Sequence, residues 1–240
     1  MLLISLLALA ASGVVLAEPE YKAIKKDITK LEDGLRDALK AERDANQKVE
    51  DNRKAQAKAT GAELADLKKD AKALSNDADK ANKKRLDAQR SLADKHGELR
   101  AAAAKYAVSQ INGSGNLDAR VAEAKTAVDD WDDAIGTLPD VPETTKVAAI
   151  VDPLEKAAAA KQVRAQLDDF DTWAVAEAKR VKTELDQVQK ILDAENQLKA
   201  AKGGPALVQS AKDLKKHLEE QGIQVGELRT IVKSRRDDLK

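Results

Sequence analysis

Cysteine is absent from the 240-residue sequence, which excludes disulfides, thiolate metal sites and a lipid-modified N-terminal cysteine. Aromatic residues are scarce as well: there are two Trp, two Tyr and one Phe. Much of the hydrophobic fraction is alanine, which buries little area, and burial contributes only about 25 cal/mol per Å². We therefore expect stability to come from helix packing rather than from a thick globular core.

The sequence also lacks a net charge, because 42 Lys and Arg residues balance 42 Asp and Glu residues. This balance removes the usual electrostatic case for binding nucleic acid. The charge is nevertheless uneven along the chain, since residues 107–175 hold 13 acidic side chains against 6 basic ones. We expect this acidic middle to attract the basic segment 21–106, either in the same molecule or in a neighbour.

No segment shows the alternating pattern of a β-strand. Ala, Lys, Asp, Leu and Glu dominate the composition, as in long helices and coiled coils. Regular apolar spacing argues against disorder for most of the chain. The sequence predicts an all-α fold, an elongated coiled coil or helical bundle in which shorter helices fold back on one very long N-terminal helix.

Residues 1–17 carry no charged side chain and resemble a signal peptide cleaved after Ala17. No Lys or Arg precedes the apolar run, so two alternatives stay open. One is an uncleaved membrane anchor, somewhat short for the roughly 20 residues of a spanning helix. The other is a start codon assigned too far downstream. No later segment is apolar enough to span a membrane, so we expect residues 18–240 to be exported, periplasmic or extracellular, and anchored only if the segment stays uncleaved.

Two heptad seams follow, and each has alternating steps of three and four residues. The first runs from Tyr21 to Val49 and the second from Leu64 to Tyr106, out of register by one residue. Thr60-Gly61-Ala62-Glu63 matches a capping box, which favours a hairpin that turns near Thr60. The strong helix formers of residues 54–59, with no Pro or Gly cluster, favour continuity. We expect one helix over 18–110, with a break near residue 60 as the alternative.

The rest of the chain is divided by Gly and Pro. Gly203-Gly204-Pro205 predicts a helix end, and Gly222 predicts another. The expected segments are a loop at 111–117, a short helix at 118–138, a Pro-containing linker at 139–153, a second long helix at 154–202 and two short amphipathic helices at 203–240.

Catalytic chemistry has few candidates. The two histidines, His96 and His217, lie far apart among charged neighbours, which predicts solvated side chains, and His217 with Glu220 would give only two metal ligands. The acidic runs around Trp131 and Phe170 suggest an aromatic residue on a buried seam flanked by solvated acids, or an acidic surface for a basic partner helix. We predict no catalytic, cofactor-binding or metal site and no cofactor. The candidate protein-contact or packing node comprises Tyr106, Trp131, Phe170 and Trp173.

These features predict a non-enzymatic extracytoplasmic protein. We expect a coiled-coil rod or spacer that self-associates, or binds other proteins, through its heptad seam. The alternative is a periplasmic holdase-type chaperone that grips unfolded clients with helical arms.

Overall fold

The computed structural model describes residues 19–136, 138–148 and 150–239. The proposed signal peptide at 1–17 lies outside these residues. The described chain is all-α, as predicted, and contains no strand. Its helices are α1 (Glu20–Gln56), α2 (Gly61–Asn112), α3 (Leu117–Asp133), α4 (Thr145–Ala148), α5 (Pro153–Asp193), α6 (Glu195–Leu198) and α7 (Gly204–Asp237).

The long N-terminal segment is a helical hairpin, so the preferred prediction of one continuous helix over 18–110 is wrong. α1 ends at Gln56, and α2 begins at Gly61 after Thr60 adopts an extended conformation. Gly61 has a φ of +61°, in the left-handed region that favours glycine. The capping-box position therefore marks the start of α2 correctly, although the Thr60 side chain forms no capping hydrogen bond.

The hairpin forms because it buries both heptad seams against each other. Tyr21 and Ile28 of α1 are buried, and the Tyr21 ring lies 5.5 Å from that of Tyr106 near the far end of α2. Near the turn, the Asn52 amide donates to the Leu67 carbonyl oxygen at 3.2 Å. The one-residue offset between the seams thus corresponds to the turn. At 1.5 Å per residue, the 52-residue α2 is roughly 80 Å long.

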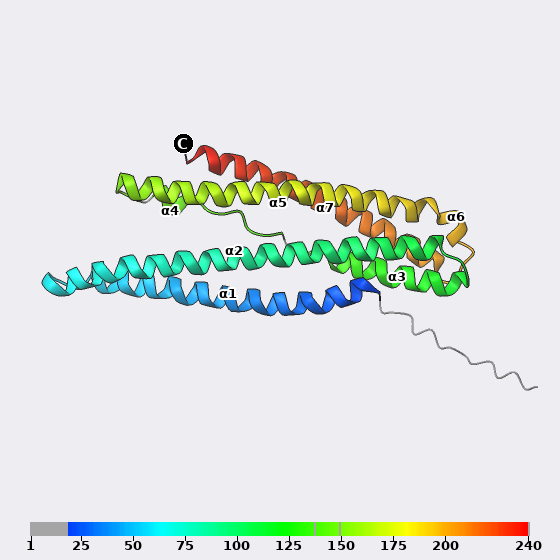
Figure 1. Ribbon diagram of the computed structural model, residues 1–240, viewed down its shortest axis with the longest axis horizontal. Coiled ribbons are helices and arrows are strands. Elements are labelled where there is room, and N and C mark those ends of the chain that lie inside the picture. The colour runs from blue at the N-terminus through cyan, green and yellow to red at the C-terminus, as the bar shows by residue number, and fades with distance from the viewer. Residues whose placement is uncertain (1–18, 137, 149, 240) are drawn as a thin grey trace, which may run out of the picture.

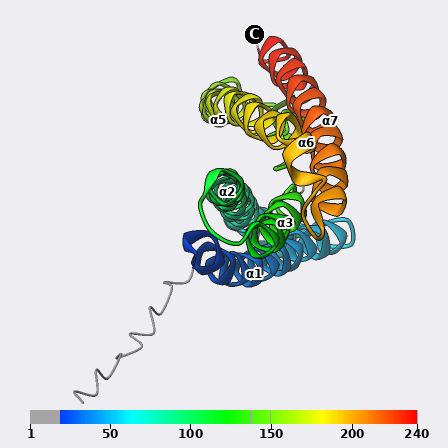
Figure 2. The ribbon, with the colours of Figure 1, turned by 90° about the vertical axis from the view of Figure 1, so that its right-hand side faces the viewer.

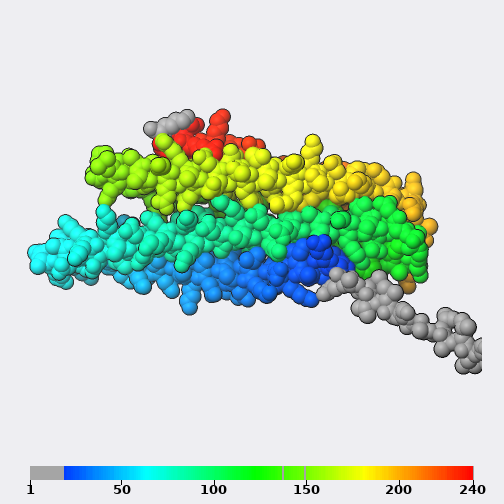
Figure 3. Space-filling model, in the orientation of Figure 1, coloured from blue at the N-terminus to red at the C-terminus, as the bar shows by residue number. Residues whose placement is uncertain are grey.

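A second hairpin, formed by α5 and α7, lies alongside the first (Figure 1). α3 packs between the two at one end, against α2 and α7. Viewed along the rod, α2 has α1 and α3 on one side and α5 on the other (Figure 2). The tip of the α1–α2 hairpin projects beyond α5 at the opposite end (Figure 3). The buried residues form two clusters, one around α3 and the other between α5, α7 and the linker.

Several predicted boundaries move. The loop prediction of 111–117 shortens, because α2 continues to Asn112 and Asn116 caps α3 by accepting from two backbone N–H groups. The predicted helix at 118–138 ends at Asp133, and the second long helix ends at Asp193, with the short α6 after it. The linker contains α4, and Asp152 caps α5 in the same way as Asn116 caps α3.

The two short C-terminal helices expected at 203–240 are a single helix, α7. Gly222 does not end it, because the buried face continues through Leu218, Gln221 and Val225 in steps of three and four. One glycine inside a helix costs only about 1 kcal/mol, which this packing offsets. Gly203-Gly204-Pro205 marks the start of α7, with Gly203 at a φ of +85°, whereas the helix end predicted there comes earlier, since α5 ends at Asp193 and α6 at Leu198.

Two glycines of α7 should respond to substitution in opposite ways. A Cβ at Gly204 would overlap the Leu198 backbone carbonyl, whereas a Cβ at Gly226 would meet nothing within 4 Å. We expect Gly204→Ala to lower the free energy of unfolding by about 2 kcal/mol or more, as in overpacked sites. Gly226→Ala should raise it by about 0.5–1 kcal/mol. Urea denaturation measures both, and equal effects of the two substitutions would contradict this packing.

Candidate functional site

The four aromatic residues of the predicted node lie in two separate places. Tyr106 packs against Tyr21 with the two rings tilted by 49°, and Trp131 is fully buried in the cluster around α3. Phe170 and Trp173 pack together in the other cluster, with ring centroids 5.4 Å apart. The structure therefore makes two packing centres from these residues and does not bring Trp131 and Trp173 into one surface.

The acidic runs around Trp131 and Phe170 agree with the first interpretation, an aromatic residue on a buried seam, while the acidic surface for a basic partner helix stays a prediction. Both rings are buried, and most of the flanking carboxylates form ion pairs near the surface. Asp130 pairs with Lys25 of α1, and Asp171 pairs with Arg229 of α7 at 3.2 Å. Exposed pairs of this kind contribute about 0–1 kcal/mol each.

A buried ionic cluster, which the sequence reasoning missed, links α2, α5 and α7. The Arg100 Nε atom donates to both carboxylate oxygens of Glu184, at 3.2 and 3.1 Å. One terminal nitrogen of Arg100 donates to Glu177. The Trp131 indole N–H donates to Glu184 at 3.2 Å, and the Gln221 amide donates to Glu177 at 3.2 Å. Arg100, Glu177, Glu184 and Gln221 are each no more than 3% exposed.

The charges in this cluster balance, because Arg180 also donates to Glu177 from the edge of the core. Gly97 makes room for this contact, since a Cβ there would overlap the Arg180 guanidinium. Burial raises the pKa of Glu184, while Arg100 and the Trp131 N–H oppose the rise. The cluster is therefore a charge-balanced but costly element of the core.

The heptad positions of charged residues on α2 and α5 contain the sequence signal for this buried cluster. Glu177 and Glu184 occupy seam positions on α5, within a run that also contains Ala174, Val181 and Val188. α2 has a second seam one residue away from the first, because it packs against α1 on one side and against α3 and α5 on the other. This second seam comprises Leu86, Arg90, Ala93, Gly97, Arg100, Ala104, Ala107 and Ile111. A charged residue repeated at seam positions on two helices would have predicted a buried ion pair.

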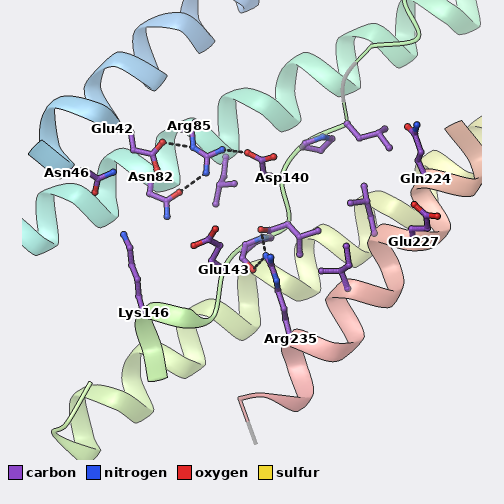
Figure 4. Close-up of a pocket in the computed structure, with 17 residues that line it drawn as sticks. Glu42, Asn46, Asn82, Arg85, Asp140, Glu143, Lys146, Gln224, Glu227 and Arg235 are labelled. Atoms are coloured by element: carbon purple, nitrogen blue, oxygen red, sulfur yellow. Dashed lines mark hydrogen bonds and ion pairs between the residues drawn. The ribbon is translucent and has the colours of Figure 1, made fainter. Parts of the chain in front are cut away.

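An open groove of about 710 Å³ lies between the two hairpins, along the linker (Figure 4). Arg85 of α2 pairs with Glu42 of α1 at 2.7 Å and with Asp140 of the linker at 2.6 Å. On the other side, Arg235 of α7 donates to the carbonyl oxygens of Val141 and Pro142. These two arginines hold the linker between the hairpins.

A second hollow of about 420 Å³ continues the groove along α7 toward α3, and Gln224 lines both. There His217 lies 2.7 Å from an Asp132 carboxylate oxygen. We call the two hollows together the α7 groove. Its lining includes seven carboxylates and three Lys or Arg side chains, a formal net charge of −4 with His217 neutral. The carboxylates are Glu42, Asp132, Asp133, Asp140, Glu143, Glu220 and Glu227.

The histidines differ from each other, and only His217 matches the prediction of a solvated side chain. His96 is half-buried beside Gly136, and its Nδ1 atom lacks a hydrogen-bond partner among the described residues. No three His, Cys, Asp or Glu side chains in the described part of the chain are placed to hold a metal ion. None of the helices that the structure describes is long and apolar enough to cross a bilayer.

Comparisons of this chain with protein-family models, with curated proteins and with solved structures found no significant match. The structure itself defines the class, an elongated all-α bundle of two helical hairpins with a groove between them. The groove and the packing of the two hairpins are therefore the basis for the function proposed below.

Removing Arg100 should expose the cost of the buried carboxylates. We expect Arg100→Met to lower the free energy of unfolding at pH 7 by about 3–5 kcal/mol, because two buried acids lose their main partner. The loss should shrink near pH 4, because burial raises the pKa of Glu184 and protonation then neutralises this carboxylate. Denaturant titrations at both pH values measure it.

The matched control replaces the whole cluster with apolar residues, as Arg100→Met, Glu177→Leu, Glu184→Met and Gln221→Leu. This variant should return to within about 2 kcal/mol of the parent, since apolar replacement of a buried ionic cluster is often neutral. If the single and quadruple variants lose equal stability, the cluster contributes mainly by packing.

The two histidines should titrate on opposite sides of the ordinary value of 6.5. Burial and the nearby Arg100 lower the pKa of His96, whereas the Asp132 carboxylate raises that of His217. The stability that His217 contributes is present below pH 6.5 and is lost as pH rises through its raised pKa. His96 acts in the opposite sense, since stability falls as pH drops below 6.5. NMR titration resolves both, and Asp132→Asn should return only His217 to its usual range.

Proposed function

We propose that this chain is a non-enzymatic, extracytoplasmic helical scaffold that binds another protein in the α7 groove. The observation that carries the proposal is the open, charged groove held between two packed hairpins. The export part of the proposal depends on the signal-peptide pattern of residues 1–17.

The scaffold part is supported by the way in which the hairpins are tied together. α2 contacts α1, α3 and α5, and the buried cluster around Arg100 connects it to α5 and α7. A rod roughly 80 Å long, built on the 52 residues of α2, can hold two contact surfaces at a fixed separation. The α1–α2 tip, which projects beyond α5 (Figure 3), and the α7 groove are the two surfaces that we propose for this role.

The packing of α1 against α2 makes self-association of two chains through the heptad seam less favourable. The seam from Tyr21 to Val49 lies against α2 of the same chain, and Glu42 on that helix is occupied by Arg85. Pairing with a second copy through this seam would require the hairpin to open. A different surface is therefore the better candidate for a partner.

The holdase-type chaperone is our second proposal. A smaller hollow of about 370 Å³ between the α1–α2 arm and α5 supports it, because Val49, Val147, Ile150 and Val163 line that hollow. Against it, the large exposed hydrophobic residues of the described part of the chain are spread over α1, the linker, α5 and α7: they are Leu39, Val151, Leu154, Val175, Ile223 and Ile231. Client capture favours contiguous apolar surface.

Two measurements test the leading proposal. Sedimentation velocity of residues 18–240 should give an elongated monomer with a frictional ratio well above that of a compact sphere. Photo-cross-linking from several exposed positions, in the exported fraction of the source cells, should trap one defined protein.

A compact monomer, or no defined adduct from any position, would count against the scaffold. Protection of several unrelated unfolded proteins from aggregation would instead favour the chaperone. N-terminal sequencing of the exported chain should begin at Glu18, whereas a retained residue 1 would indicate an anchor.

A further inference from the structure

We infer that the partner segment recognised by the α7 groove is a basic amphipathic helix. This inference rests on the proposed function and specifies the chemistry of its partner. It is drawn from the shape of the groove, from the unpaired carboxylates that line it and from an unsatisfied buried acceptor at one end.

The shape of the groove matches a helix. On α7 the lining residues recur every three or four positions from His217 to Arg235, so they form one stripe along the helix. This stripe is roughly 27 Å long at 1.5 Å per residue, enough for a partner helix of about five turns. The facing wall comes from the end of α3, the linker, α1 and α2 (Figure 4).

The lining of the groove combines apolar and acidic side chains. Leu86, Leu138, Leu228 and Ile231 supply apolar surface, and Ile231 is 40% exposed. A helix that docks in a groove places its apolar face inward and its polar residues at the rim. The matching partner therefore has an apolar stripe flanked by charged residues.

The acidic side chains of the lining determine the sign of the charge that the partner residues should carry. Asp133, Glu143 and Glu227 line the α7 groove and form no hydrogen bond or ion pair with other described residues. The other acids already have partners, such as Arg85 for Glu42 and His217 for Asp132. Lys or Arg side chains of a partner would complement the three that remain.

A separate observation points to a hydrogen-bond donor in the same place. Gln221 lines the end of the α7 groove near α3 and is 3% exposed. Its amide nitrogen donates to Glu177, but its Oε1 atom is buried without a donor among the described residues. Native proteins seldom leave such an acceptor unpaired, and because the atom is sealed from solvent, a Lys or Arg side chain of the partner would reach it once the Gln221 side chain turns toward the groove.

The test uses a synthetic 18-residue peptide with Leu at alternating steps of three and four and Lys at most other positions. Fluorescence anisotropy with the folded chain should show saturable 1:1 binding, which weakens with added salt, and circular dichroism should show a gain of peptide helix. Two reference peptides are a scrambled sequence of the same composition and a version with Glu in place of Lys.

Matched substitutions on α7 locate the binding. Glu227→Lys, in the α7 groove, should weaken binding about tenfold, whereas Glu219→Lys, which does not line it, should change binding less than about twofold. Ile231→Asn should weaken binding several-fold, and the more exposed Ile223→Asn should not. Thermal melts check that each variant is folded, and the milder Glu227→Gln should weaken binding in the same direction.

Each contrary result overturns the inference. These results are no saturable binding, equal binding of the scrambled peptide, or equal effects of Glu227→Lys and Glu219→Lys. A second copy of the chain would be the occupant if sedimentation showed a dimer that Glu227→Lys dissociates. If the peptide fails while cross-linking still traps one defined partner, the scaffold proposal stands and only the basic-helix inference is lost.

Discussion

α2 has to pack against two sets of neighbours at once, and the rest of the structure depends on this constraint. One seam, which includes Leu99 and Tyr106, faces α1, and a second seam one residue further on faces α3 and α5. Small residues such as Ala103, Ala104 and Ala107 allow close approach on several sides. The alanine content that argued against a globular core is what allows a central helix to be surrounded.

The buried Arg100 cluster gives this alanine-rich packing a defined register. Ala and Leu seams tolerate sliding, because one turn of helix resembles the next, whereas an Arg that must meet Glu184 and Glu177 fits at one position. Such clusters add little net stability, since burying the charges costs about what their pairing returns. We therefore regard specificity of alignment as the main contribution of the cluster, and the quadruple apolar variant separates alignment from stability.

Heptad spacing was sufficient to predict an all-α chain and the two seams that contain Tyr21 and Tyr106, but it did not predict that these seams pack against each other, because one continuous helix was preferred. It was insufficient at residues 57–60, because a hairpin and a register shift leave the same trace in the sequence, and local helix propensity outweighed the single capping signal. α7 was divided wrongly at Gly222, since Gln221 was not recognised as a seam residue. The Arg100 cluster was missed for the same reason, because charged residues were taken as solvated by default.

The acidic middle of the chain divides into two groups in the folded protein. Some of its carboxylates pair with the basic N-terminal hairpin, as Asp130 does with Lys25 and Asp140 with Arg85, so the attraction expected from the sequence occurs within one molecule. Asp133 and Glu143 are left over at the α7 groove, where Glu227 of α7 joins them. A chain with no net charge thus creates an acidic surface by using its own cations elsewhere. This local excess, rather than any property of the whole chain, is what would select a basic partner.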